Sequence, residues 1–156
     1  MGTAVVVIVV AGVLASVVAA LVWLRRRLLI VSVVGRSMEP TLRPGDRVLA
    51  RRVPLAAIRR GDVVVVVAPV RATTDSTRLE TGAPALLIKR AYAVPGDPVP
   101  VDRVPILRRE PEPVVPADRL VVLGDNPPVS YDSRECGYIT GQGVLGVVIR
   151  PRLPSR

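Results

Sequence analysis

Hydrophobic and polar residues divide this 156-residue chain into two unequal parts. The first part, Thr3 to Leu24, contains no charged residue and is followed directly by Arg25-Arg26-Arg27. As an α-helix it would span about 33 Å, which is enough to cross the hydrocarbon core of a bilayer. Trp23 lies near its end, where aromatic residues of membrane interfaces are common. We therefore predict a retained transmembrane anchor over residues 3–24. A cleavable signal peptide fits less well, because its positive charge would precede a shorter apolar run.

The second part consists of short apolar runs separated by turns that contain glycine, proline and aspartate. Runs of this kind are typical of β-strands, and the turns between them favour a β domain over packed helices. We predict an exposed loop over residues 69–84 and an irregular excursion over the proline-rich residues 98–118. We predict a mainly β fold, in which a single N-terminal transmembrane helix precedes one compact β-rich domain over residues 28–156. The expected strands are Leu28–Val34, Arg47–Ala50, Val63–Val67, Leu86–Val94, Leu120–Leu123 and Val144–Ile149.

The composition excludes several kinds of catalytic site. The chain contains no histidine, which removes Ser-His-Asp catalysis, Cys-His catalysis and the usual His-ligated metal sites. Its single cysteine, Cys136, cannot form an internal disulfide. A hydrolytic reaction would therefore use a carboxylate or an amine as its base, and we expect no metal and no other cofactor.

The formal net charge of +9 indicates an anionic partner or an ordinary basic surface. Three tyrosines and one tryptophan are few for stacking on nucleic-acid bases. We therefore expect membrane lipid, and not nucleic acid, as a partner.

Ser37 lies in the segment Gly35-Arg36-Ser37-Met38-Glu39-Pro40, directly after a predicted strand. Because Pro40 restricts the backbone, the Ser37 hydroxyl would project from a constrained bend. A nucleophile needs such a position, with a backbone N–H nearby for the oxyanion. Serine beside glycine and proline is also common in ordinary turns, so this segment alone leaves both interpretations open.

Lys89 is the only lysine in the chain, beside 21 arginines. A guanidinium does not release its proton at neutral pH, so no arginine can replace Lys89 as a base. Strand alternation places Lys89 on the same face as Leu87 and Ala91, and Arg90 on the opposite face. Burial among apolar residues would lower the pKa of the ammonium group. The alternative is a surface lysine whose stem covers the domain while its ammonium stays in water.

A third polar segment, Gly124 to Arg134, follows the predicted strand that ends at Leu123. Asp132 and Arg134 are two residues apart and are expected to pair. The Ser130 hydroxyl is expected to orient the lysine amine. A hydrophilic loop with side-chain-capped turns is the alternative.

In this order the three segments resemble those of the signal peptidase I family, whose serine endopeptidases use a Ser-Lys dyad. The first resembles the nucleophile box, Gly35-x-Ser37-Met38-x-Pro40-Thr41-Leu42. The second resembles the general-base box, Lys89-Arg90 and then Pro95-Gly96-Asp97-x-Val99. The third resembles the last box, Gly124-Asp125-Asn126, then Ser130-x-Asp132-Ser133-Arg134 and Gly137. Arg60-Gly61-Asp62-Val63 also matches a structural segment, so the resemblance spans residues 35–137.

The resemblance implies that Ser37 attacks the scissile carbonyl and that Lys89 takes its proton. Ser130 would hold the Lys89 amine, and Asp132 and Arg134 would brace the site. The Ser37 amide would belong to the oxyanion hole. The remaining supporting residues would be Gly35, Asp125 and Asn126.

The sequence departs from the family pattern at three places. Gly35 stands where some relatives carry an oxyanion-binding hydroxyl, so backbone donors alone would serve. Pro127 and Pro128 follow Asn126 in place of the common arginine, which puts the contacts of that loop in doubt. Cys136 replaces an aromatic residue before Gly137.

The sequence therefore predicts a membrane-anchored serine endopeptidase that removes leader or signal peptides from precursor proteins through an acyl-enzyme. The resemblance implies an extracytoplasmic catalytic domain, whereas the arginines at 25–27 favour the cytoplasm by the positive-inside rule. Two alternatives stay open. One is a cytoplasm-facing maturation protease for one dedicated precursor, as among compact relatives. The other is a non-catalytic, membrane-bound β domain that binds leader peptides.

Overall fold

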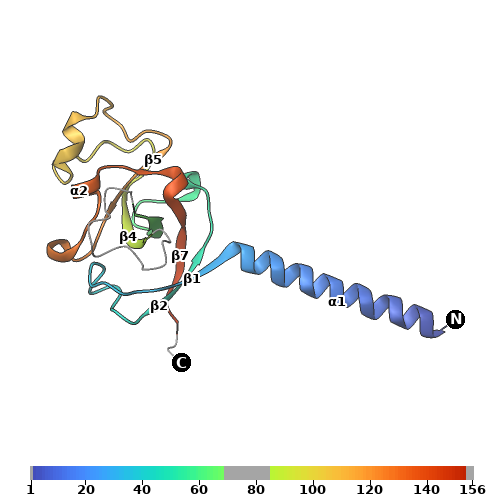
Figure 1. Ribbon diagram of the computed structural model, residues 1–156. Coiled ribbons are helices and arrows are strands. Elements are labelled where there is room, and N and C mark those ends of the chain that lie inside the picture. The colour runs from blue at the N-terminus through green and yellow to red at the C-terminus, as the bar shows by residue number, and fades with distance from the viewer. Residues whose placement is uncertain (1, 69–84, 154–156) are drawn as a thin grey trace.

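Helix α1 (Gly2–Arg27) projects from a β-rich domain in the computed structural model, which describes residues 2–68 and 85–153 (Figure 1). Its part Val6–Arg27 is long and apolar enough to cross a membrane, and none of that stretch is buried against the domain. The predicted helix over residues 3–24 therefore forms and continues to Arg27. The loop predicted over residues 69–84 lies outside the described residues.

The described part of the domain forms one seven-stranded antiparallel sheet with the order β1-β2-β7-β3-β4-β5-β6. All six predicted strands are confirmed, with small shifts at their ends. The prediction missed β6, which has only two residues and so carries no periodic signal. The strands are β1 (Leu28–Ser32), β2 (Arg47–Arg51), β3 (Val63–Val67), β4 (Leu86–Ala93), β5 (Arg119–Leu123), β6 (Ile139–Thr140) and β7 (Val144–Leu153).

Strand β7 is longer than predicted, because it continues past Pro151 to Leu153. A proline has no N–H to donate to a neighbouring strand. The pairing of β7 with β2 shifts register at this point, between the pairs Arg47↔Leu153 and Leu49↔Arg150. The irregularity therefore accommodates the proline inside the sheet.

The five valines of β3 show why a continuous apolar run forms a strand here. Val65 packs into one hydrophobic cluster with Met38 and Leu42. Its neighbours Val64 and Val66 pack into a second cluster on the other side of the sheet. Because successive side chains of a strand point to opposite faces, both faces of β3 are buried and neither requires a polar residue.

Short helices interrupt the connections between the strands. The excursion over residues 98–118 is irregular, as predicted, and contains a bridge between Pro98 and Val114. The segment after β5 is more regular than the hydrophilic loop considered above, because Asp132 begins a short helix with Glu135 as its capping partner. The helical segments are η1 (Leu55–Ala57), η3 (Pro105–Arg109), η4 (Pro127–Val129), α2 (Ser133–Cys136) and η5 (Gly141–Gly143).

Gly-Asp turns fix the ends of several strands. In the turn before β3, Asp62 accepts a hydrogen bond from the backbone amide of Arg59 at 2.9 Å. Gly61 between them has a φ of +91°, a conformation that side-chain-bearing residues rarely adopt. Asp46 and Asp97 accept the equivalent bond in their own turns. Turn chemistry thus sets where β2 and β3 begin and where β4 ends.

Candidate catalytic site

The segment that carries Ser37 follows β1 and is held from two sides. Met38 and Leu42 are buried in the core, and the Leu42 amide donates to the Met38 carbonyl at 2.8 Å. From the other side, the Asn126 amide donates to the Ser37 carbonyl at 2.9 Å. The Asn126 side chain also donates to the Arg36 carbonyl at 3.1 Å. The half-buried Ser37 side chain therefore lies on a constrained bend, as the sequence predicted.

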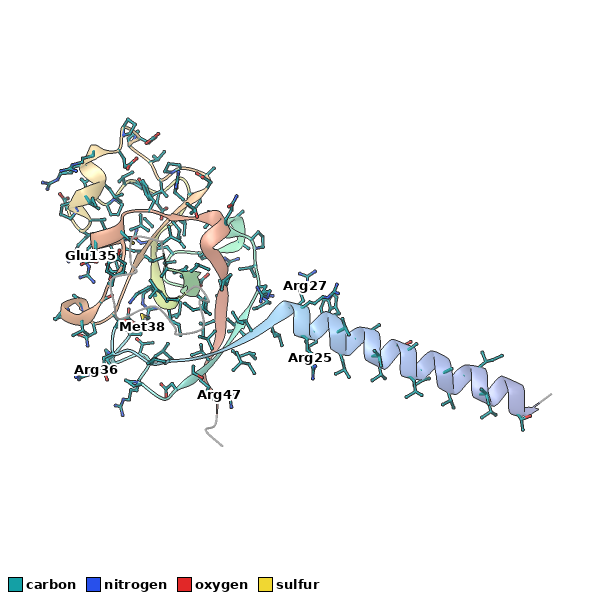
Figure 2. The ribbon with its side chains drawn as sticks, in the orientation of Figure 1. Arg25, Arg27, Arg36, Met38, Arg47 and Glu135 are labelled. Carbon is teal, nitrogen blue, oxygen red and sulfur yellow. The ribbon has the colours of Figure 1, made fainter. Side chains whose placement is uncertain are left out.

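Figure 2 labels two residues of this segment. Met38 lies inside the domain, whereas Arg36 lies at its periphery. The Arg36 side chain is exposed and forms an ion pair with Glu39 at 3.0 Å. The Arg36 side chain thus faces solvent and the Met38 side chain faces the core, and Ser37 lies between these two residues in the chain.

Lys89 lies in β4 and is only 3% exposed, which excludes the surface-lysine alternative. It pairs with Val64 of β3 and shares its face with Leu87 and Ala91, as strand alternation predicted. Its Nζ donates to Ser37 Oγ at 2.7 Å and to Ser130 Oγ at 3.1 Å. The sheet thus brings together two residues that are 52 positions apart in the chain.

Burial lowers the pKa of the Lys89 ammonium below its ordinary value. The Asp132 carboxylate opposes this shift, because a nearby negative charge favours the ammonium, whereas Arg134 adds to it. The net direction is downward. A larger fraction of Lys89 is therefore the neutral amine at a given pH than for a lysine in water.

Asp132 organises the polar residues behind Lys89. It is fully buried, and its Oδ2 accepts from Ser130 Oγ at 2.6 Å, from the Gly124 amide at 2.8 Å and from Arg134 Nη2 at 2.6 Å. Its Oδ1 accepts from Arg134 Nε at 2.9 Å. The structure thus brings the predicted Ser130, Asp132 and Arg134 into one network that reaches Lys89 through the Ser130 hydroxyl.

The carboxyl group of Asp132 is held in its ionised form. Burial alone would raise its pKa, but hydrogen bonds from Arg134, Ser130 and the Gly124 amide outweigh burial and lower it. A buried carboxylate with these donors fixes the direction of the Ser130 hydroxyl, which must donate to Asp132. Ser130 can then only accept from Lys89.

Gly124 is in close contact with both halves of the site. A Cβ added there would overlap Ser130 Oγ and would lie 2.6 Å from Ser130 Cβ and 2.7 Å from the Ser37 carbonyl oxygen. The backbone at Gly124 therefore packs against the segment that carries Ser37 and against Ser130 at once, which requires a residue without a side chain.

Asp125, predicted as a supporting residue, belongs to a second network. It pairs with Arg90 through two bonds of 2.8 Å and 2.6 Å and accepts from Thr41 Oγ1 at 2.6 Å. Arg90 also donates to the Gly61 carbonyl at 2.8 Å. Burial would raise the pKa of Asp125, but the bonds from Arg90 and Thr41 lower it overall. This network connects the segment that carries Ser37 with β4 and the turn before β3.

Sequence reasoning assigned no role to Arg90 or Thr41. Arg90 lies on the face of β4 opposite to Lys89, as predicted, but its bond to Asp125, 35 residues away, was not predicted. Thr41 lies in the nucleophile box itself. Its hydroxyl, only four residues from Ser37 in the sequence, was the signal that could have predicted its part in the site. The predicted Gly35 lines the cavity beside Ser37, and a Cβ added there would meet nothing within 4 Å.

A cavity of about 320 Å³ opens beside Ser37 and Lys89. Its walls are residues 31–38, the start of β4, Val129 and Tyr131, and most of these are apolar. A larger cavity of about 460 Å³ lies between η3 and α2 and contains neither Ser37 nor Lys89. The smaller cavity is the candidate substrate site, because Ser37 and Lys89 line it. Within residues 2–68 and 85–153, no group of three or more acidic or cysteine side chains is placed to hold a metal ion.

Known proteins resemble this chain over most of its length. Residues 2–109 and 103–151 match the family described as "Signal peptidase, peptidase S26". "Signal peptidase I" of Leptolyngbya laminosa is 34% identical over 134 residues, which cover 72% of this chain and 62% of the relative. "Probable signal peptidase I-2" of Synechocystis sp. (strain ATCC 27184 / PCC 6803 / Kazusa) is 33% identical over 128 residues, which cover 70% and 56%. The chain thus spans less than two thirds of the length of these relatives. On this evidence it belongs to the signal peptidase family, peptidase S26.

Proposed function

We propose that this protein is a membrane-anchored serine endopeptidase that removes leader or signal peptides from precursor proteins. The observation that carries the proposal is the 2.7 Å contact between Lys89 Nζ and Ser37 Oγ in a buried setting beside a cavity. An amine and a hydroxyl at this distance form a base and a nucleophile in a chain without histidine. Helix α1 would anchor the domain in the membrane.

In the acylation step, the neutral Lys89 amine accepts the proton of the Ser37 hydroxyl while Ser37 Oγ attacks the scissile carbonyl carbon. The carbonyl oxygen becomes an oxyanion, and the Ser37 amide is the donor we assign to it. The Lys89 ammonium then gives its proton to the departing amine as the peptide C–N bond breaks. The product is an ester between Ser37 and the leader peptide, and Lys89 is neutral again.

In the deacylation step, Lys89 accepts a proton from a water molecule that attacks the ester carbonyl. The ester bond breaks, the proton returns to Ser37 Oγ, and the leader leaves as a carboxylic acid. Ser130 would position the amine throughout, because its hydroxyl accepts from Lys89 and is fixed by Asp132. Arg134 would keep Asp132 ionised.

The borders of the cavity favour an extended peptide as substrate. Among the described residues, β1 is one of the two edge strands of the sheet, and the first half of β4 pairs only with β3. Both strands contribute to the cavity walls. A peptide lying there in an extended conformation can bond to unpaired backbone groups and place alternate side chains against the apolar walls. Leader peptides are the substrate class that the names of the relatives indicate.

The proposal is tested by mass spectrometry of precursor peptides incubated in detergent with the wild-type protein or with Ser37→Ala. The expected result is one new pair of fragments with the wild type and none with Ser37→Ala. The variant removes only the nucleophilic oxygen, so its thermal unfolding should match that of the wild type. Equal cleavage by both proteins would show that Ser37 is not the nucleophile, and no cleavage by either would favour a peptide-binding role.

The pH dependence of cleavage should follow the ionisation of Lys89. Below the pKa of this ammonium, kcat/KM is expected to rise about tenfold per pH unit, because only the neutral amine accepts a proton. The midpoint should lie below the ordinary lysine value of 10.5, since burial lowers the pKa. A pH–rate profile of a peptide substrate measures this, with thermal unfolding at each pH as the control for stability. A flat profile from mildly acidic to alkaline pH would contradict an amine base.

A further inference from the structure

Five arginines gather where helix α1 meets the β domain. Arg25, Arg26 and Arg27 end the helix, and Figure 2 shows Arg25 and Arg27 on opposite sides of it. Arg51 ends β2 and pairs with Leu28, the residue directly after the helix. The Arg52 amide donates to the Arg27 carbonyl at 2.8 Å. We call these five residues the arginine collar.

The positive charge of the collar has no internal counter-charge in the described structure. All five side chains are exposed. Within residues 2–68 and 85–153, the ion pairs involve Arg36, Arg90, Arg119 and Arg134, and no member of the collar. The collar is therefore a concentrated positive surface that faces solvent or an external anion.

The collar continues directly from the apolar surface of α1. The helix exposes its valine and leucine side chains along its length and is uncharged up to Arg25. The Arg27 guanidinium lies 5.4 Å from the centre of the Trp23 ring, so this charge reaches back along the helix. If the apolar stretch occupies the hydrocarbon core, Trp23 and the collar fall within the layer of lipid headgroups.

We propose that the arginine collar binds the phosphate groups of anionic phospholipids in the membrane that α1 crosses, and thereby holds the β domain against the bilayer. The inference rests on the proposed anchoring by α1, but not on the proposed peptidase activity. Guanidinium groups bind phosphate oxygens in a bidentate manner, and an anionic surface attracts clustered basic residues. Placement at the end of an apolar helix favours lipid over an acidic protein or a nucleic acid.

Arg51 and Arg52 make the collar more than the basic flank of a helix. A flank made only of residues 25–27 would tether the domain at one point and leave its tilt free. Two further arginines from β2 give the domain its own contact with the headgroups. Because β1 runs from the collar toward Ser37, this contact would set the orientation of the catalytic cavity relative to the bilayer.

The test compares two double variants of the full chain in vesicles of phosphatidylcholine with a minor fraction of phosphatidylglycerol. Arg51→Gln/Arg52→Gln removes the domain's share of the collar. Arg108→Gln/Arg109→Gln changes the net charge equally in η3, the yellow segment on the side of the domain away from α1 (Figure 1). Spin-labelled lipids measure the preference for phosphatidylglycerol over phosphatidylcholine. We expect the first variant to lower this preference at least about twofold, the second to leave it unchanged, and salt to weaken it in the wild type.

Quenching of the fluorescence of Trp23, the only tryptophan, by brominated acyl chains distinguishes lipid binding by the arginine collar from membrane anchoring by α1. If Arg51→Gln/Arg52→Gln showed normal quenching and an unchanged lipid preference, the proposed lipid binding by the arginine collar would be wrong. The proposed anchoring by α1 would still stand. An equal loss of the lipid preference in Arg108→Gln/Arg109→Gln would also contradict lipid binding by the arginine collar, because net charge alone would then explain the preference. Absence of quenching in the wild type would show that α1 does not insert, and both proposals would fail.

Discussion

Replacing Lys89 by arginine is expected to lower kcat/KM for a leader peptide by about 10³-fold or more. The substitution keeps a positive charge but removes the only amine side chain in the protein. A guanidinium remains protonated at all working pH values, so it cannot take the proton of the Ser37 hydroxyl. General-base catalysis contributes about 10²–10⁴-fold, and removing one member of a coupled pair also disables the other. The measurement is steady-state cleavage of a peptide substrate by the purified full chain.

A second variant controls for the possibility that Lys89→Arg fails to fold, since the larger guanidinium must fit where Lys89 is buried. Lys89→Met places an unbranched apolar side chain among Leu87, Ala91 and Val64, and it should fold at least as well as the wild type. It is expected to be as inactive as Lys89→Arg. The combination of Lys89→Met with Ser37→Ala should lose no more activity than either change alone, because the two residues act as a unit. If Lys89→Met kept more than about a tenth of the activity, Lys89 would not be the base.

The burial of Lys89 in a strand was predictable because its signals are local and chemical, whereas the contact of Lys89 with Ser37 was expected from the family resemblance. Lys89 is the single lysine in a chain that lacks histidine, and its burial follows from the two-residue period of a strand. The strands themselves were predictable for the same reason, as the valine run of β3 shows. None of these inferences requires knowledge of which strands are neighbours.

The second network was not predictable because it depends on long-range register. Asp125 bonds to Thr41, which is 84 residues away in the sequence, and to Arg90, which is 35 residues away. Both contacts depend on the order of the strands in the sheet. The sequence predicted correctly that Asp132 and Arg134 pair, but for a different reason. The prediction rested on their spacing of two residues, whereas in the structure Asp132 caps a short helix whose first turn contains Arg134. The spacing of Asp132 and Glu135 is a capping-box pattern and was the signal for that helix.

Replacing Gly124 by alanine is expected to lower kcat/KM by about 10²-fold and to destabilise the fold by about 1–3 kcal/mol. The new Cβ would lie 2.6 Å from Ser130 Cβ, so rotating the Ser130 hydroxyl away cannot relieve the overlap. It would also lie 2.7 Å from the Ser37 carbonyl oxygen, which is a backbone atom. Either Gly124 or the nucleophile segment must therefore move, and a displacement of about 1 Å between reacting groups has an effect of this size. Peptide cleavage and thermal unfolding of the same preparation measure the two quantities.

Gly35→Ala is the matched control for stability, because an added Cβ there meets nothing within 4 Å. It should change the free energy of unfolding by less than about 0.5 kcal/mol. A further variant separates the two contacts of Gly124. Adding Ser130→Gly to Gly124→Ala removes the overlap with the Ser130 side chain but leaves the contact with the Ser37 carbonyl. Part of the lost stability should return while cleavage stays low, since the backbone contact persists and the amine has lost its positioning hydroxyl. Wild-type cleavage by Gly124→Ala would mean that the nucleophile segment tolerates movement, and the close packing at Gly124 would then have no part in placing Ser37.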